Sequence, residues 1–490
     1  MLYELRIVRG IATMARSRQK QPLIAIIGAT GTGKSQVGSL STNDLSTATS
    51  DADHNSQLAV ELAKRYNGEV INGDAMQLYT GLPIITNKIT TEEQQGIPHH
   101  LLGCIGLDEQ TWVVGTFVKK ALRVVEGIRS RGKVPILVGG THYYLQSLLF
   151  RDGLAEHDET HEEKSFVKDT KEEWPILQQD TESLLAELRR VDPIMADRWH
   201  PNDRRKIQRS LEIYLQTGKK ASDIYAEQRQ QTIEHRSVAE TDSGIPDEPS
   251  LRFPTLLFWV HAESDALKER LDKRADKMMH CGLLDEVKTL DSFADAEAAG
   301  DRPVDESRGV WVSIGYKEFK AYTKAVSSLD VSAKEIERLK AEALERTKIS
   351  TRQYAKRQVR WIRIKLINAL AQAHADKQLY LLDGSDVSSF DTSVVQPAAE
   401  LTEKFLAASS PLPEPSATSA AAAEMLMPRR DYDLSAHPGR WVKEHCEVCG
   451  VTCVTEDQWK MHVKSKAHRK LVSKMGKAEG ERKTEEVAGG

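Results

Sequence analysis

Short apolar runs that alternate with helical patterns predict an α/β fold. Continuous apolar runs are typical of parallel strands that are buried on both faces. Strands are predicted at residues 23–27, 69–74, 134–138, 256–260 and 379–383. Helices are predicted at residues 58–66, 113–130 and 334–370. Strands that alternate with helices predict a parallel sheet covered by helices.

A glycine-rich segment directly follows the first predicted strand. It reads Gly28-Ala29-Thr30-Gly31-Thr32-Gly33-Lys34-Ser35, which has the order and spacing of a P-loop. Its glycines allow backbone N–H groups to point at anionic oxygens, Lys34 adds a positive charge, and Ser35 can reach Mg²⁺. The segment predicts a site for a phosphate or diphosphate, without indicating which molecule carries it or whether ATP binds.

Polar residues also follow the next two strands. Asp74 ends the second predicted strand, and Gly139-Gly140-Thr141 follows the third. Both are expected at the carboxyl edge of the sheet, where open α/β folds bind ligands. Asp74 can bind Mg²⁺, act as a base, or cap the following helix. The N–H groups of the Gly-Gly-Thr turn are expected to face the same crevice.

Residues 37–57 interrupt the helix that normally follows a P-loop. They are rich in Ser, Thr, Asn and Asp, which favour loops, and an amphipathic helix follows from Leu58. Codons for Val37 begin with GT and Gln57 can be encoded by CAG, as at intron borders. We hypothesise a translated intron or a gene-model error, which a cDNA lacking this stretch would support. The alternative is a genuine surface loop.

Composition narrows the class of protein. For 490 residues, about two to four domains are expected. The net charge of −4 means that nucleic-acid binding would depend on local basic patches.

The five cysteines do not suggest a disulfide framework, and no run of about 18 apolar residues predicts a membrane span. The basic residues 1–20 resemble a mitochondrial targeting segment or form a basic lead-in, with Met14 as a second possible start.

Near the C-terminus, Cys446, Cys449, His462 and His468 have the spacing of a Cys₂His₂ zinc finger. Two thiolates and two imidazoles suit a closed tetrahedral Zn²⁺ site, and Cys453 is expected to be a bystander. The Ser-, Pro- and Ala-rich residues 408–424 are expected to belong to a linker. The charged residues after about 474 are expected to be disordered.

Several longer motifs accompany the P-loop and the finger. In chain order they are Ile-Asn-Gly-Asp-Ala-Met-Gln-Leu-Tyr (71–79), Ile-Thr-Asn-Lys (85–88), Gly-Ile-Pro-His-His (96–100), Val-Gly-Gly-Thr-His-Tyr-Tyr-Leu-Gln (138–146), His-Pro-Asn-Asp-Arg-Arg-Lys-Ile-Gln-Arg (200–209), Gln-Thr-Gly-Lys-Lys (216–220), Trp-Val-Ser-Ile-Gly-Tyr-Lys-Glu-Phe (311–319) and Thr-Arg-Gln-Tyr-Ala-Lys-Arg-Gln (351–358). Together they resemble the eukaryotic, fungal-type tRNA dimethylallyltransferases (tRNA isopentenyltransferases), over roughly residues 22–385 and the finger. Departures are residues 37–57, and Gly73 and Ala75, where many members have Ser beside the acid.

The resemblance implies a prenyl transfer to tRNA. The P-loop would hold the diphosphate of dimethylallyl diphosphate rather than ATP, and the dimethylallyl group would pass to N6 of adenine 37 beside the anticodon. Asp74 matches the family's general base, Thr30 a P-loop threonine near the bridging oxygen, and Arg274 an arginine that reaches the diphosphate. The alternative for Arg274 is one cation among many on an exposed helix face. Lys34, Ser35 and Mg²⁺ would offset the charge of the leaving diphosphate.

The resemblance also implies contacts with the tRNA anticodon stem-loop. Positions that match contacts to the target base and nearby RNA are Asp74, Ala75, Met76, Gln77 and Thr141. A basic helix face is expected to contact the tRNA backbone, through Arg204, Arg205, Lys206 and Arg209. The basic helix at 334–370 is a second candidate tRNA surface or an amphipathic packing helix. The finger resembles the matrin type, and its basic residues suit the tRNA stem: Lys460, Lys464, Lys466, Arg469 and Lys470.

We therefore predict a P-loop NTPase-like parallel-sheet core with a mainly helical inserted domain and a C-terminal Cys₂His₂ zinc finger. The predicted segments are 1–21 (basic), 22–150 (catalytic core), 151–253 (helical, tRNA-binding), 254–390 (remainder of the core), 391–440 (linker), 441–472 (finger) and 473–490 (charged tail). Residues 232–251 and 291–308 are expected to be surface insertions, and the paired histidines at 99–100 a rigid loop. We expect a monomer in the cytoplasm and mitochondrion, with the nucleus left open.

Other functions stay open from the sequence. A P-loop kinase or NTPase acting on RNA would bind ATP at Lys34 and need an acceptor-phosphate site, whereas this chain offers an RNA-sized basic surface and a finger. An inactive RNA-binding homologue is the alternative if residues 37–57 are real and disturb the phosphate site. Prenylation of free AMP would not explain the finger.

Overall fold

The structure, a computed structural model, describes residues 22–33, 58–150, 174–227, 230, 251–300, 302–328, 330–407, 411–428 and 443–474. The described residues form two compact units, one within residues 1–154 and 249–430 and the other within residues 155–248 and 431–490. Several predictions fall outside the described residues and stay predictions: those for residues 1–21, Lys34, Ser35, residues 37–57, the tail after 474 and, except for Leu251, the surface insertion at 232–251.

The first unit is built on a six-stranded, entirely parallel sheet with the order β3-β2-β4-β1-β5-β6. Its strands are β1 (Leu23–Gly28), β2 (Gly68–Asn72), β3 (His99–His100), β4 (Val134–Val138), β5 (Thr255–His261) and β6 (Leu379–Asp383). The predicted parallel sheet is confirmed. The rigid loop expected at the paired histidines is wrong, because these residues form the edge strand β3. Two histidines carry no apolar run that would reveal a strand.

The central strand β1 packs against helices on both of its faces. Leu23, Ala25 and Ile27 belong to one hydrophobic core, and Ile24 and Ile26 belong to a second core across the sheet. All five side chains are fully buried. A strand with two buried faces needs apolar residues at every position, which explains the continuous run in the sequence.

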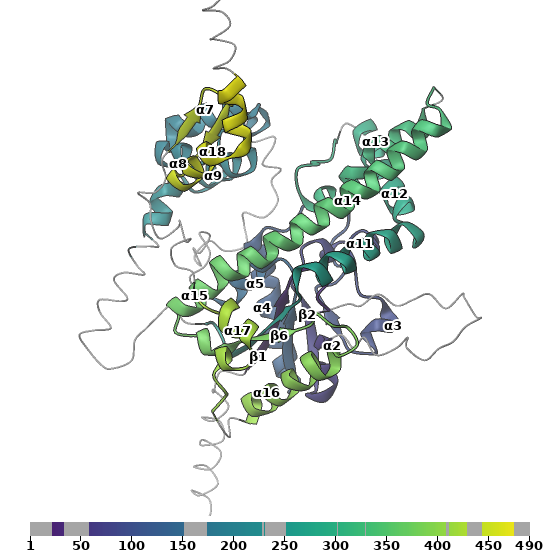
Figure 1. Cartoon of the computed structure of the whole chain (residues 1–490), viewed down its shortest axis with the longest axis vertical. Coiled ribbons are helices and arrows are strands. Elements are labelled where there is room, and N and C mark those ends of the chain that lie inside the picture. Colours follow the sequence, from purple (N-terminus) through teal and green to yellow (C-terminus); the bar gives the residue numbers. More distant parts are fainter. Residues whose placement is uncertain are drawn as a thin grey trace, which may run out of the picture. The chain divides into compact units, whose positions relative to one another are not determined.

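Helices cover both faces of this sheet (Figure 1). The first core contains residues of α4 (Val114–Ser130), α5 (His142–Leu149), α12 (Leu283–Ala299), α13 (Tyr316–Ser327), α15 (Ile367–Gln372) and α17 (Ala420–Met425). The second core contains residues of α2 (Leu58–Arg65), η6 (Asp391–Val395) and α16 (Gln396–Ala407). The remaining elements of this unit are η1 (Met76–Leu78), α3 (Thr91–Gln94), α11 (Ser264–His280), η3 (Gly309–Val312), α14 (Ala333–Trp361), η4 (Ile362–Leu366), η5 (Asp376–Gln378) and η7 (Pro415–Ala417). Among the described helices, none has the length and apolar character needed to cross a membrane.

The long helix α14 spans 29 residues and continues through the π-helical turn η4 into α15. Figure 1 shows it extending away from the sheet with α13 alongside its outer part. Lys348 pairs with Asp276 at 2.7 Å, and Arg352 pairs with Asp272, both on α11. These two cations of the predicted tRNA surface therefore hold α14 against α11, as the packing-helix alternative expects.

The linker predicted at residues 391–440 is wrong for part of its length. Residues 391–407 lie within the expected linker, but their apolar positions at helical spacing, among them Val394, Ala398 and Leu401, pack η6 and α16 against the sheet. Within 411–428, Ala422 of α17 is fully buried. The segment at 291–308, predicted as a surface insertion, begins as the end of α12, which continues to Ala299 with exposed or half-buried side chains. The amino-acid composition of these segments did not predict helices, because polar and small residues outnumber the apolar residues that pack against the core.

The second unit has its own small core. η2 (Pro175–Gln178), α7 (Thr181–Val191), α8 (Pro193–Arg198) and α9 (Arg204–Thr217) pack around leucine and isoleucine side chains. The buried carboxylate of Asp192 accepts hydrogen bonds from the N–H groups of Met195 (3.2 Å) and Ser222 (2.9 Å). The finger comprises β7 (Glu444–Cys446), β8 (Val451–Cys453) and α18 (Glu456–Lys464). Lys443 before β7 donates from Nζ to the carbonyl of Ala196 (3.2 Å), so the insertion and the finger share one unit.

A buried acid on β2 has a strongly shifted pKa. Glu69 is 3% exposed, and its carboxylate lies 2.6 Å from Arg131 Nη2, 2.9 Å from Lys133 Nζ and 2.7 Å from His100 Nε2. The hydrogen bond from Arg131 is the largest of the contacts that lower the pKa of Glu69 to about 2, and burial opposes them. These contacts join β2 to the edge strand β3 and to the turn before β4.

We expect Glu69→Gln to lower the free energy of unfolding at pH 7 by about 1–3 kcal/mol, because charge-assisted hydrogen bonds are lost. The pKa of Glu69 is lower in the folded state than the ordinary 4.5, so its contribution is complete above pH 4.5 and is lost as the pH falls towards 2. Urea titrations should show a difference from the parent chain that shrinks below pH 4.5. An equal difference at pH 7 and pH 3 would contradict this; Glu400→Gln, exposed on α16, is the control.

Candidate active site

The glycine loop leaves β1 at the carboxyl edge of the sheet. The Thr32 hydroxyl donates to the carbonyl of Ala29 (2.9 Å) and closes the turn. Gly33 has φ +84°, and a Cβ there would lie 2.7 Å from the ring of Phe390. Packing therefore fixes the loop conformation up to Gly33 and requires glycine at this position.

Asp74 follows β2 in a turn that Asn72 fixes. Asn72 Oδ1 accepts the Asp74 N–H (3.0 Å), and its Nδ2 donates to the carbonyls of Asp74 (3.0 Å) and Leu101 (2.8 Å). Asp74 Oδ1 in turn accepts the N–H of Met76 (3.0 Å) at the start of η1. The N-cap residue of η1 is Ala75, and this helix has no side-chain cap. Asp74 instead closes the turn that leads into η1, and this hydrogen bond orients the carboxylate.

Thr141 joins the turn after β4 to the turn after β2. Its Oγ1 accepts the N–H of Ala75 (3.0 Å). The two backbones are in close contact, since a Cβ on Gly139 would lie 2.3 Å from the carbonyl carbon of Gly73. Asp74 and Thr141, which the sequence predicts near the target base, are thus brought to one edge of the sheet.

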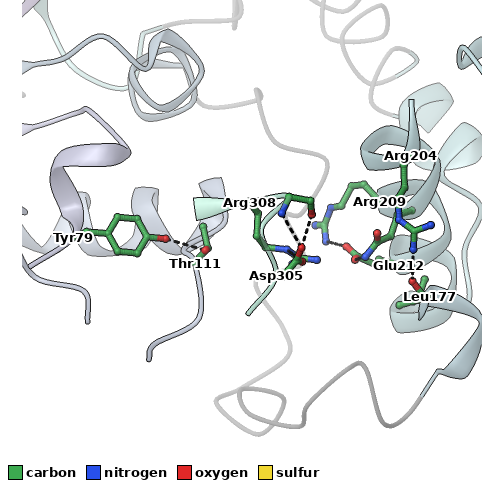
Figure 2. Close-up of polar contacts among 10 residues, drawn as sticks. Tyr79, Thr111, Leu177, Arg204, Arg209, Glu212, Asp305 and Arg308 are labelled. Carbon is green, nitrogen blue, oxygen red and sulfur yellow. Dashed lines mark hydrogen bonds and ion pairs between the residues drawn. The ribbon is translucent and has the colours of Figure 1, made fainter. Parts of the chain in front are cut away.

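Gln77 and Tyr79 of the same motif make contacts within the protein. Gln77 Nε2 donates to the carbonyl of Asn87 (2.8 Å), in the Ile-Thr-Asn-Lys motif. The Tyr79 hydroxyl lies 2.9 Å from Thr111 Oγ1 (Figure 2). These contacts fix the chain after Asp74, and an RNA contact of Gln77 stays a prediction.

Arg274 reaches the glycine loop from α11. Its Nη1 donates to Thr30 Oγ1 (2.6 Å). Burial lowers the pKa of Arg274 to about 10, and the nearby negative charge of Asp74 opposes that shift. The guanidinium is therefore charged at neutral pH and lies close to both side chains. The alternative of one cation on an exposed helix face is wrong, and the three residues predicted as catalytic lie together.

Two site residues on α14 are missing from the sequence prediction. Gln358 is 4% exposed, accepts the N–H of Thr30 at Oε1 (2.8 Å) and donates from Nε2 to the carbonyl of Gly140 (2.8 Å). Burial and the charge of Asp74 raise the pKa of Tyr354, so its hydroxyl stays protonated beside that acid. Both residues lie in the motif at 351–358, but nothing in that motif indicated what either side chain contacts.

Two of the four cations predicted to contact tRNA from α9 are half-buried and have partners within the second unit. Arg204 donates from Nη2 to the carbonyl of Leu177 (3.0 Å) and from Nη1 to that of Gln179 (2.5 Å). Arg209 pairs with Glu212 at 3.3 Å. Figure 2 shows the contacts of Arg204 with Leu177 and of Arg209 with Glu212. Arg204 therefore fixes η2 to α9, a role that the helical spacing did not reveal.

The other two cations of α9 are exposed. Lys206 pairs with Asp203 at 2.8 Å and lies over the ring of Trp199, with Nζ 5.2 Å from its centroid. Arg205 lies on the exposed surface of the same helix. Exposed pairs of this kind contribute little to stability, so both side chains are available for an anionic partner.

The four predicted zinc ligands lie together in the finger. The ligand atoms of Cys446, Cys449, His462 and His468 are all within 4.8 Å of one another. Nε2 of His462 is buried and has no hydrogen-bond partner among the described residues, as expected for a nitrogen that faces a metal. Two thiolates and two imidazoles match a closed tetrahedral Zn²⁺ site. The residues present therefore fit structural zinc.

We expect Cys446→Ser to abolish zinc retention through gel filtration, because a closed site with three remaining ligands binds the ion weakly. Cys453→Ala is the matched control, since Cys453 is also buried in the finger but lies outside the cluster. Elemental analysis should find one zinc per chain in the parent and the control. Equal zinc in Cys446→Ser would contradict the assignment of ligands.

Comparison with known proteins assigns the chain to a family. The IPP transferase family model matches residues 77–365, which is more than half of the chain. The chain belongs to the IPP transferase family. A model of C2H2-type zinc fingers also matches residues 445–468, the segment that contains the four ligands. The resemblance drawn from the motifs is thus confirmed, and the predicted fold class with it.

Similar proteins cover nearly the whole chain of this family member. The tRNA dimethylallyltransferases of Schizosaccharomyces pombe and Saccharomyces cerevisiae are 38% and 34% identical to it, over 92% and 91% of this chain and 95% and 91% of theirs. The Homo sapiens tRNA dimethylallyltransferase is 32% identical over 92% of this chain and 86% of its own. A solved structure of a eukaryotic dimethylallyltransferase acting on tRNA matches with a TM-score of 0.67 and 31% identity, over 95% of this chain and 100% of that one.

Proposed function

We propose that this chain transfers the dimethylallyl group of dimethylallyl diphosphate to N6 of adenosine 37 in tRNA, giving N6-isopentenyladenosine and diphosphate. Relatives named tRNA dimethylallyltransferase, similar over most of their length, support this proposal. Within the chain, one observation carries it: Arg274 donates to Thr30 of the glycine loop and lies near Asp74 at the same edge of the sheet.

The donor side of the site stabilises the leaving group. The diphosphate binds at the glycine loop, where Arg274 and Thr30 lie. Negative charge grows on the diphosphate as its bond to the allylic carbon breaks, and a buried cation stabilises such charge more strongly than water does. With a pKa of about 10, Arg274 carries that charge at neutral pH. Mg²⁺ at Ser35 would add further positive charge, and it stays a prediction of the P-loop pattern.

The acceptor side removes a proton. The exocyclic amine of adenine is a poor nucleophile, so a base must take its proton as the new N–C bond forms. Asp74 is the carboxylate at this edge of the sheet, and the Met76 N–H orients it. The adenine leaves its stack to reach the site, where Ala75 and Thr141 form adjoining backbone turns. N6 loses its proton to Asp74 as it forms the bond to the allylic carbon. The bond between that carbon and the diphosphate oxygen breaks, and its electron pair leaves with the diphosphate.

The tRNA is bound by its phosphate backbone. We assign this role to the exposed cations Arg205 and Lys206 of α9 and to the basic residues of the finger, because attraction to phosphates supplies much of nucleic-acid affinity. Arg204 also fixes the fold of the second unit through its two carbonyl contacts, and a tRNA contact of this residue stays a prediction.

The test measures which of two labelled donors transfers its label to tRNA. The purified full-length chain, with and without residues 37–57, is incubated with tRNA and either carbon-labelled dimethylallyl diphosphate or γ-phosphate-labelled ATP. We expect carbon label in the tRNA and no phosphate label. Transfer of phosphate from ATP without prenylation would overturn the proposal in favour of an RNA kinase. If neither form of the chain transfers any label, the inactive homologue is favoured instead.

A further inference from the structure

We propose that Gln358 is a positioning residue that fixes the donor loop, residues 28–33, against the acceptor turn, residues 139–141. The inference rests on the proposed function and adds a residue to which neither the motifs nor the comparisons give a role. Gln358 comes from the last turn of α14, far in sequence from both loops, and it is almost completely buried.

The carboxamide of Gln358 continues the hydrogen bonding between two strands beyond their ends. β1 and β4 are neighbours in the sheet, paired up to Ile26 and Val138. The next backbone hydrogen bond, from Gly139 N–H to the carbonyl of Ile26, is already long at 3.3 Å. Beyond this hydrogen bond the segments after β1 and β4 are joined by the side-chain amide of Gln358. It accepts the N–H of Thr30 and donates to the carbonyl of Gly140, each at 2.8 Å.

Each of the two hydrogen bonds of Gln358 is linked, through one further residue, to a side chain that is proposed to act in the reaction. On the donor side, Gln358 fixes the backbone of Thr30, whose hydroxyl accepts the hydrogen bond from Arg274. On the acceptor side, it fixes Gly140, the residue before Thr141, whose hydroxyl binds the turn that carries Asp74. One side chain therefore sets the separation between the leaving-group cation and the base. Small displacements of this kind reduce reaction rates strongly without weakening binding as much.

The chemistry of both contacts requires a neutral group that donates and accepts at once. An amide does so, and so does a protonated carboxyl group, whereas a carboxylate only accepts and would face the Gly140 carbonyl with two lone-pair-bearing oxygens. Methionine has a similar length and volume but offers neither contact. Gln358→Met and Gln358→Glu therefore separate the space that the side chain fills from the hydrogen bonds that it makes.

The experiment measures the single-turnover rate of prenyl transfer, the dissociation constants of tRNA and dimethylallyl diphosphate, and the melting temperature. We expect Gln358→Met to slow transfer by about 10–100-fold, with dissociation constants changed by less than about fivefold. Gln358→Glu should be similarly slow at pH 8.5. Its rate relative to the parent chain should then rise as the pH is lowered to 6, because the protonated carboxyl group restores both hydrogen bonds. Gln372→Met and Gln372→Glu, exposed at the end of α15, serve as matched controls and should match the parent.

Each outcome decides between the alternatives. If the parent chain does not prenylate tRNA, the proposed function fails and the inference fails with it. If the parent is active and Gln358→Met keeps more than half of its rate, the positioning role alone is wrong. If Gln358→Glu loses activity with the same pH profile as the parent, Gln358 has only a structural role, whatever the melting temperatures of the variants.

Discussion

Replacing Asp74 by asparagine should slow prenyl transfer by about 10²–10⁴-fold, the usual contribution of a general base. Asparagine has the same shape, and its side-chain oxygen can still accept the N–H of Met76 that Asp74 accepts at 3.0 Å. The turn after β2 is therefore kept, while the group that takes the proton from N6 is lost. The measurement is the single-turnover rate with saturating tRNA and donor.

This substitution also separates a catalytic role of Asp74 from a structural one. If Asp74 only holds the turn before η1, its replacement by asparagine should change the rate very little, since the hydrogen bond to Met76 survives. Asp376→Asn, at an exposed position in η5, controls for the change of charge. A rate for Asp74→Asn within twofold of the parent chain would remove Asp74 as the base and leave it only the role of fixing the turn before η1.

Replacing Arg274 by methionine should lower kcat/KM for dimethylallyl diphosphate by about 10²–10³-fold, as is typical when one preorganised stabiliser of developing charge is removed. Methionine fills much of the same space but cannot donate to Thr30 Oγ1 or carry charge. The pKa of about 10 means that the parent guanidinium is protonated throughout the range from pH 6 to 9, so the loss should be constant over that range. Steady-state kinetics at several pH values checks both points.

The neighbouring residue provides the control for Arg274. Lys273 lies on the same helix, but its side chain is 75% exposed and pairs with Glu269 at 2.6 Å. Lys273→Met removes an equal charge from the surface of α11, and we expect its kcat/KM within twofold of the parent. Equal losses in both variants would show that the general charge of α11, rather than the contact with Thr30, matters for the reaction. Arg274→Lys should recover only part of the rate, since a lysine cannot reproduce the planar guanidinium.

Local patterns predicted the parts of the fold and site that depend on local physics. The continuous apolar run at 23–27 follows from the two buried faces of β1, and the P-loop spacing predicts a tight glycine turn wherever a strand ends at it. Asp74 could be found because it follows an apolar run at the edge of the sheet where open α/β folds bind ligands. Arg274 was a candidate only through the resemblance to a family, since nothing in its own helix pattern distinguishes it from Lys273.

The parts that the sequence did not reveal depend on contacts between distant segments. Gln358 bonds Thr30 across 328 residues, and no periodicity relates them. The basic pattern of α9 did not reveal that the Arg204 guanidinium donates to the carbonyls of Leu177 and Gln179. The edge strand β3 gains its pairing from β2 rather than from its own two histidines. In each of these cases the structural role of the residue depends on the segment that it contacts, which the residue type alone does not indicate.

The most direct test of the account uses mass spectrometry of an anticodon stem-loop after incubation with the full-length chain and dimethylallyl diphosphate. Two RNAs are compared, one with adenine at position 37 and one with unsubstituted purine, which lacks the exocyclic amine. The account predicts the addition of a single C₅H₈ unit to adenine 37 and no change in the purine RNA. Unmodified adenine 37, or addition of the prenyl group to the purine RNA as well, would contradict the claim that this site prenylates an exocyclic amine.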